Sequence, residues 1–204
     1  MSNLRKVDRI ILSIEASDGA GVKLRRSIGA ELISELDPFL LLDNCGTENP
    51  DDYISGFPSH PHRGFETVTY MIEGHMLHED HLGNRGDLRN GGVQWMTAGR
   101  GIIHSEMPQQ EEGVMRGFQL WLNLPAAEKM TKAGYRDIQP EEIPELAFDG
   151  GKLKLIAGTL QIDGQAHAGA MPDRTTQPIY ADIHLASDGS LRLPLPEGHN
   201  AMLY

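Results

Sequence analysis

The chain has 204 residues, enough for one large domain or two small ones, and its 39% hydrophobic content is sufficient for a core. Its formal net charge of −11 argues against direct binding of nucleic acid, because the neutralisation of phosphates requires a basic face. We therefore assign the acidic excess to solubility, and a protein partner stays compatible with it.

No segment predicts a membrane protein or a secreted one. The longest apolar runs, such as residues 39–42, are far shorter than the ~20 residues of a membrane-spanning helix. The N-terminus carries basic residues but lacks the apolar stretch and the small-residue cleavage site of a signal peptide. The single cysteine, Cys45, cannot form an internal disulfide. The sequence therefore predicts a cytoplasmic protein.

Short segments between turns favour an architecture of many strands, since 23 glycines and 12 prolines divide the chain. In chain order, we expect strands at residues 7–14, 22–28, 39–42, 67–72, 76–81, 93–97, 102–106 and 114–122. Residues 48–55 read as an acidic loop, and residues 26–36 are ambiguous. Antiparallel strands of this number and spacing predict a sandwich or a barrel.

The remaining chain predicts a connector and a second, smaller unit. Residues 125–150 carry six acids and three prolines, which fits a connector, and residues 126–134 could form one short helix after Pro125. Further strands are expected at residues 152–157, 178–185 and 191–195, and residues 201–204 read as a strand just beginning. We therefore divide the chain into an N-terminal unit at 1–124, a connector at 125–150 and a C-terminal unit at 151–204.

Two pairs of metal-binding side chains each stand two residues apart in segments that we expect to be extended. The first pair is His60 and His62, and the second is His104 and Glu106. Residues i and i+2 of a strand point the same way, so each pair can reach one ion. Pro61 removes a ladder donor, so its segment should lie at a sheet edge or a bulge. Three nitrogens and one oxygen suit iron, manganese, nickel, copper or zinc, and the sequence predicts a mononuclear metal site.

The residues around these pairs resemble the pirin family of the cupin superfamily. The matching strings are DPFLLLD from residue 37, FPSHPHRGFET from 57, HED from 78, QWMTAGRGIIHSEMP from 94 and QLWLNL from 119. The resemblance implies an all-β protein of two tandem cupin barrels (double-stranded β-helix or jelly-roll barrels), with the metal in the N-terminal one. We expect the N-terminal barrel to be complete and the second to be truncated, because pirins are noticeably longer.

The resemblance also implies the ligands, namely iron(II) held by His60, His62, His104 and Glu106. Manganese, nickel, copper, cobalt and zinc are the alternative metals. Cupins outside this family often take their carboxylate ligand from just after the first histidine pair, where Glu66 stands. Glu66 shares the parity of His60 and His62, so it is the rival oxygen ligand. We favour Glu106, because its spacing from His104 copies the first pair.

Two functions compete. Family members are associated with quercetin 2,3-dioxygenase activity, which implies an enzyme whose substrate is a small aromatic enol such as a flavonol. Glu106 would then be the catalytic base that accepts the proton of the metal-acidified hydroxyl. Family members in eukaryotes are associated with transcriptional co-regulation, which implies a non-catalytic protein whose metal oxidation state alters a surface read by a protein partner. A structural cupin without metal would require the paired ligands to be accidental.

Other candidates have plainer roles. The spacing of His75, His78 and His81 puts neighbours on opposite faces of a strand, so we expect surface or hydrogen-bonding roles and no second metal site. Arg63 and Arg100 lie near the ligand pairs and could hold a substrate anion, a ligand carboxylate or a structural ion pair. Apolar residues of the C-terminal unit need a cover, so this unit should pack on the N-terminal barrel or on a neighbouring subunit. These residues are Leu191, Leu193, Leu195 and Met202.

Overall fold

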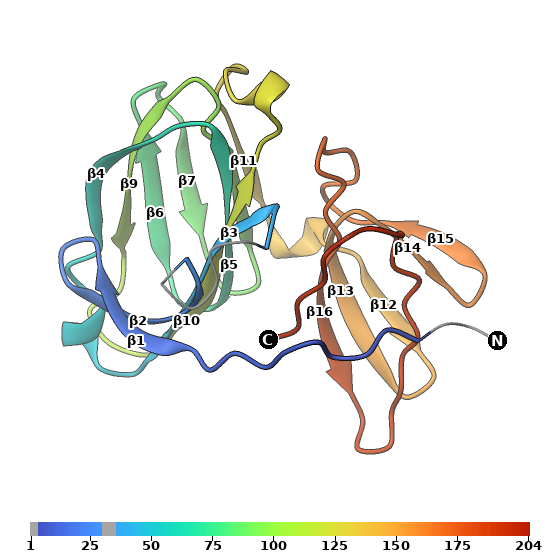
Figure 1. The fold of residues 1–204 in the computed structure, drawn as a ribbon. Coiled ribbons are helices and arrows are strands. Elements are labelled where there is room, and N and C mark those ends of the chain that lie inside the picture. Colours follow the sequence, from blue (N-terminus) through green and yellow to red (C-terminus); the bar gives the residue numbers. More distant parts are fainter. Residues whose placement is uncertain (1–3, 30–35) are drawn as a thin grey trace.

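Two antiparallel sheets form a barrel in the computed structural model, which describes residues 4–29 and 36–204 (Figure 1). The first sheet has the order β1-β2-β3-β10-β5-β8-β11 and the second the order β4-β9-β6-β7. The strands of the first are β1 (Ile14–Asp18), β2 (Val22–Ile28), β3 (Phe39–Thr47), β5 (Phe65–Glu73), β8 (Val93–Thr97), β10 (Met115–Asn123) and β11 (Gly134–Ile138). Those of the second are β4 (Phe57–His62), β6 (Met76–Asp80), β7 (Arg85–Leu88) and β9 (Ile102–Pro108).

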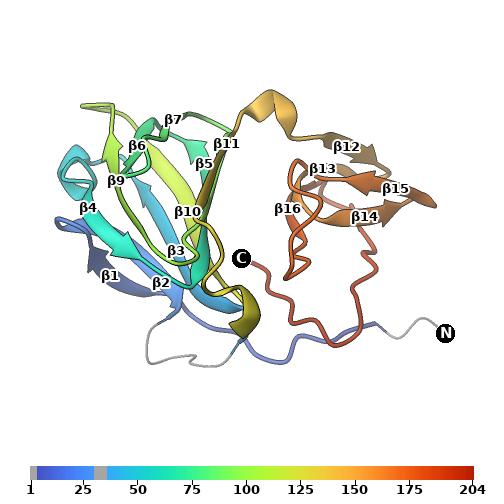
Figure 2. The ribbon, with the colours of Figure 1, turned by 90° about the horizontal axis from the view of Figure 1, so that it is seen from above.

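A smaller C-terminal unit, residues 145–204, lies beside the barrel in both views (Figures 1 and 2). One of its sheets contains β12 (Glu145–Phe148), β13 (Gly151–Ala157) and β16 (Tyr180–Leu185), and the other contains β14 (Thr159–Ile162) and β15 (Gln165–Ala168). Short 3-10 turns lie at η1 (Pro50–Asp52), η2 (Ala126–Glu128) and η3 (Pro140–Glu142). The all-β cupin architecture expected from the sequence is confirmed.

The seven-stranded sheet has an apolar outer face and a polar inner face. Successive side chains of a strand alternate between faces, so Val68 of β5 packs outward while Thr69 faces the barrel interior. The outer face forms the main core cluster, to which β5, β8 and β10 contribute buried side chains. The same cluster contains Ile156, Ala157 and Met171 of the C-terminal unit. The expectation that this unit packs onto the barrel is therefore confirmed.

Polar contacts add to this packing between the two units. The Tyr70 hydroxyl of β5 donates to the Asp182 carboxylate of β16 over 2.8 Å. Glu66, only 1% exposed, accepts a hydrogen bond from Thr97 and pairs with the Arg174 guanidinium. A carboxylate buried to this extent needs such partners, because an unpaired buried charge is costly. Glu66 is thus a structural contact between the barrel and the C-terminal unit.

The expected strands from 22–28 through 114–122, together with those at 152–157 and 178–185, are present. Their ends differ by one or two residues at most, except that the strand expected at 39–42 continues to Thr47. Pro61 lies on β4, which is an edge strand with a register shift between Phe57 and His60, as predicted. Of the ambiguous stretch, residues 26–28 belong to β2 and residues 30–35 lie outside the described part of the chain.

Three expected elements are wrong. Of the strand expected at residues 7–14, only Ile14 lies in a strand, β1. Side chains such as Val7 and Ile10 stay exposed, and no strand within the described ranges pairs with residues 7–13. Residues 191–195 also lack strand pairing, although Leu191 and Leu193 pack on the core of the C-terminal unit. The helix expected over 126–134 is only the 3-10 turn η2, which ends before β11 begins at Gly134.

The predicted connector contains β11 and β12. β11 pairs with β8 of the barrel, whereas β12 pairs with β13 of the C-terminal unit. The proposed boundaries at 124 and 150 therefore stay predictions. Within the described ranges, no helix has the length and apolar character needed to cross a membrane.

We predict that Glu66→Gln lowers the free energy of unfolding by about 1–3 kcal/mol, because it leaves the half-buried Arg174 without its counter-charge. Denaturant unfolding measures the change. Glu145→Gln is the matched control, since Glu145 pairs with Lys152 while both side chains are about half exposed. It should cost less than about 1 kcal/mol. Equal effects of the two substitutions would contradict the structural role of Glu66.

Candidate metal centre

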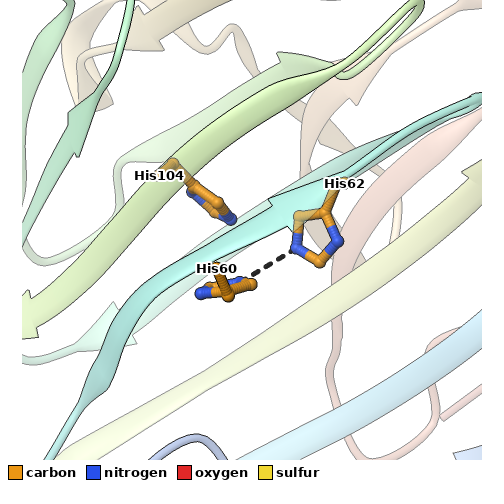
Figure 3. Close-up of side chains that lie close together, drawn as sticks. All are labelled: His60, His62 and His104. Atoms are coloured by element: carbon orange, nitrogen blue, oxygen red, sulfur yellow. Dashed lines mark hydrogen bonds between the residues drawn. The ribbon is translucent and has the colours of Figure 1, made fainter.

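Three histidines converge at the outer edge of the four-stranded sheet (Figure 3). His60 and His62 lie on β4 and His104 on β9, with His60 and His104 directly paired in register. One ring nitrogen from each lies within 4.8 Å of the others. The Nε2 atoms of His60 and His62 are 3.0 Å apart, and the His60 and His104 ring centroids are 4.4 Å apart. The two-residue spacing thus brings three of the four predicted ligands together.

The orientation of these rings suits a cation. His60 Nδ1 lies 2.7 Å from the Pro58 carbonyl oxygen, an acceptor, so Nδ1 carries the proton and Nε2 keeps a lone pair. His104 Nε2 is buried and has no hydrogen-bond partner among the described residues. A buried acceptor without a partner is costly, and a metal ion would satisfy it. The three imidazoles therefore fit a metal that prefers nitrogen ligands.

Burial favours the neutral form of two of the three histidines, His62 and His104. Burial, together with the neighbouring His104 and His60, lowers the pKa of His62 from 6.5 to about 4. Burial, with His60 and His78 nearby, lowers the pKa of His104 to about 3. Protons and metal ions compete for the same lone pairs, so both side chains are ready to bind metal at neutral pH.

Glu106, the fourth predicted ligand, lies outside the group of three histidines. It is 3% exposed, and its carboxylate accepts hydrogen bonds from Thr69 Oγ1 over 3.2 Å and Gln119 Nε2 over 2.9 Å. The Trp121 indole in turn donates to Gln119 Oε1 over 3.1 Å. Glu106 thus faces the barrel interior two residues from His104, with its orientation fixed by β5 and β10.

Glu66, the rival ligand, belongs to the outer face of the other sheet, where it contacts Arg174 and Thr97. The even spacing of Glu66 from His60 and His62 suggested that all three side chains lie on one face of a strand. Such alternation holds only within one continuous strand. Between His62 and Phe65 the chain leaves β4 and enters β5 through a turn at Gly64, whose φ of +83° favours glycine. The turn resets the alternation, so Glu66 faces away from the site.

His78 is the site residue that the sequence reasoning did not place here. It is 1% exposed on β6, its Nδ1 lies 3.3 Å from His104 Nδ1, and its ring stacks on Tyr135. His78 lies two residues after the apolar Met76, and the structure buries both on the same face of β6. His75 and His81 have the hydrogen-bonding roles predicted for them, with Asp87 and with the Ile103 amide.

Aromatic side chains border the histidines. The Phe65 and Trp121 rings are 4.6 Å apart at their centroids, and both lie about 5 Å from the His62 ring. Both are half-buried, so they present an aromatic wall beside the histidines. Arg63 and Arg100 are exposed, and the Arg63 guanidinium contacts the Met130 sulfur. The site therefore combines nitrogen ligands with a surface suited to a flat aromatic molecule.

Comparisons with known proteins agree with this geometry. A family profile described as Pirin matches residues 21–122. A Pseudomonas aeruginosa protein named "Putative quercetin 2,3-dioxygenase" is 58% identical over 206 residues, which cover 100% of this chain and 72% of that protein. Human pirin is 42% identical over 206 residues, which cover 100% of this chain and 67% of the human protein.

A solved structure shares the arrangement of strands. The crystal structure of a quercetin 2,3-dioxygenase from Acinetobacter baumannii matches with a TM-score of 0.77 and 28% identity. The match covers 90% of this chain and 60% of that one, so the chain spans less than two thirds of the solved relative.

We predict that metal-free protein loses stability as the pH falls from about 6.5, the pKa of an unfolded histidine, towards about 4. The folded pKa values of His62 and His104 are lowered, so the unfolded chain binds more protons in this window and acid favours it. Chemical denaturation between pH 7 and 5 measures the slope. His104→Gln should flatten it, whereas His167→Gln on β15 should not. An unchanged slope for His104→Gln would contradict the prediction.

Proposed function

The chain belongs to the pirin family of the cupin superfamily, and we propose that it is a metal-dependent dioxygenase that acts on quercetin-like flavonols. The observation that carries this proposal is the group of three converging histidines beside the aromatic wall of Phe65 and Trp121. The names of the Pseudomonas and Acinetobacter relatives support the same substrate class.

We propose iron(II) as the metal, held by His60, His62 and His104 with Glu106 as the oxygen ligand. This donor set suits a first-row transition metal that can change its oxidation state. When bound, the metal would acidify an enol hydroxyl and supply the electron transfer that a reaction with dioxygen needs. Manganese, nickel, copper, cobalt and zinc suit the same ligands, so they are the metals to compare with iron.

The aromatic wall would orient the substrate. A flavonol is flat, so it can stack on Phe65 and Trp121 with its hydroxyl and carbonyl oxygens towards the three histidines. The indole nitrogen of Trp121 is already occupied by Gln119, so Trp121 offers mainly its ring surface. Binding by an aromatic face selects for planar substrates and fixes the reacting oxygens near the ligands.

Glu106 would accept the proton of the flavonol hydroxyl. Thr69 donates to one of its oxygens and Gln119 to the other, so each keeps lone-pair capacity for a proton. These donors hold the carboxylate on the interior side of the histidines, where it is shielded from water by burial. Glu106 would then be the general base for a flavonol hydroxyl that lies within hydrogen-bond reach of its carboxylate.

We predict that His60→Ala, His104→Ala and Glu106→Gln each reduce the bound metal, measured by elemental analysis of iron-loaded protein. Each substitution removes one donor, so affinity should fall while folding persists. Glu66→Gln, which changes a carboxylate on the other sheet face, should keep its metal. Full metal retention by His104→Ala would overturn the assignment. Loss by Glu66→Gln with retention by Glu106→Gln would show that the wrong carboxylate was chosen.

We predict slow cleavage of quercetin by the iron-loaded protein, measured as oxygen consumption. Chelation of the metal should abolish it, and Glu106→Gln should lower the rate about 100-fold or more, the usual contribution of a general base. His62→Ala is the metal-site control. Turnover that survives chelation would exclude the dioxygenase. Bound metal without turnover would instead favour a regulatory protein read by a protein partner.

A further inference from the structure

A chain of three buried polar side chains runs from the last residue of β6 to the metal centre. It consists of Asp80 and His78 on β6, followed by His104 on the neighbouring strand β9. We propose that Asp80 and His78 are positioning residues that keep the proton of His104 on Nδ1, so that Nε2 presents its lone pair to the metal. This inference rests on the proposed metal centre and adds two residues to it.

Asp80 is the fixed end of the chain. Its side chain is fully buried, and its carboxylate accepts hydrogen bonds from the Leu82 amide over 2.9 Å, the Asn84 amide over 3.0 Å and Asn84 Nδ2 over 2.8 Å. Burial opposes its ionisation, but hydrogen bonds from Asn84, Leu82 and His78 outweigh burial and lower the pKa of Asp80. An ionised carboxylate can only accept, so Asp80 dictates the direction of the next hydrogen bond.

Because Asp80 can only accept, it determines which nitrogen donates and which accepts in the hydrogen bond between His78 and His104. His78 Nε2 faces Asp80 Oδ2 at 3.5 Å, so Nε2 is the nitrogen that carries the proton. With Nε2 directed at Asp80, Nδ1 is the nitrogen left to accept, and it lies 3.3 Å from His104 Nδ1. One of two facing nitrogens must donate, and His104 Nδ1 is left to do so. His104 Nε2 therefore has the free lone pair, and it is the buried atom without a partner.

The ring of His78 is held in place from its other face. Tyr135 of β11 stacks on it with centroids 4.2 Å apart and an interplanar angle of 17°. A side chain at Gly86 of β7 would overlap the Tyr135 hydroxyl, so this glycine leaves room for the stack. His78 is thus clamped between the metal ligand and an aromatic ring, which fixes the geometry that the proton arrangement needs.

His60 and His104 differ in the hydrogen-bond partner that orients each imidazole ring. His60 donates from Nδ1 to a backbone carbonyl, which no substitution of a neighbouring side chain removes. His104 depends on a side-chain acceptor, so its tautomer can be changed by replacing His78 alone. A hydrogen-bond partner behind a metal-binding histidine commonly changes metal affinity by about 10–100-fold.

The test uses the 204-residue protein and three variants of it. His78→Leu removes the acceptor, while His78→Asn keeps one, because the amide oxygen takes about the place of Nδ1. His75→Leu is the matched control, since His75 lies on the same hairpin and pairs with Asp87 away from the site. Nitrogen-15 NMR of metal-free protein reports which His104 nitrogen is protonated, and titration with cobalt(II) reports metal affinity.

We expect unaltered protein to carry the His104 proton on Nδ1. His78→Leu should mix the two tautomers and weaken cobalt binding by about 10–100-fold. His78→Asn should restore most of the affinity, and His75→Leu should leave both readouts unchanged. A His104 proton on Nε2 in unaltered protein would overturn the proposal, even if His78→Leu fails to fold. So would unchanged cobalt affinity in a folded His78→Leu protein.

The metal centre itself is tested separately by His104→Leu. If this variant binds cobalt as tightly as unaltered protein, the proposed metal centre is wrong, whatever the tautomer. If it loses cobalt while His78→Leu keeps it, the metal centre stands and the positioning role of His78 is wrong.

Discussion

The alternation of side chains across the seven-stranded sheet is the constraint on which the rest of the structure depends. On β5, Val68 and Tyr70 face outward into the cluster shared with the C-terminal unit, and Thr69 faces inward towards Glu106. One strand therefore serves two purposes, packing on one side and polar chemistry on the other. A slip of one residue would exchange the faces and destroy both, so the apolar contact with the C-terminal unit also secures the register of the site.

The polar interior has an energetic cost that the outer face must offset. Besides His104 Nε2, buried atoms of Gln94, Tyr135 and Asp137 lack hydrogen-bond partners among the described residues. Each such atom destabilises the fold by about 1–3 kcal/mol unless water or a ligand satisfies it. A barrel selected for stability alone would fill this space with apolar side chains. The retained polarity agrees with the proposed binding of a metal ion and a polar aromatic substrate.

Local sequence patterns predicted most of the strands and the convergence of the histidines, because both depend on spacing within one strand. Where the outcome depended on distant partners, the sequence was insufficient. Residues 7–13 have strand-forming side chains but pair with no strand of the described chain, since β propensity expresses packing more than backbone preference. Glu66 lies across a turn from His62, so its face could not be read from parity. The two-residue spacing of Met76 and His78 places both on one face of β6. The contact of His78 with His104 could not be predicted in this way, because His104 lies on another strand, β9.

The strand β11 connects the proposed metal centre with the C-terminal unit. It lies in the segment expected to connect two units, yet it completes the seven-stranded sheet through β8 and carries Tyr135 to His78. Its next residue, Arg136, faces the other way and donates to the Ala170 carbonyl of the C-terminal unit over 2.7 Å. Two successive side chains thus contact the support of the metal centre and the neighbouring unit. A displacement of the C-terminal unit would therefore move β11 and with it Tyr135, which stacks on His78. The proposed metal affinity of the barrel should then depend on residues that lie outside the barrel.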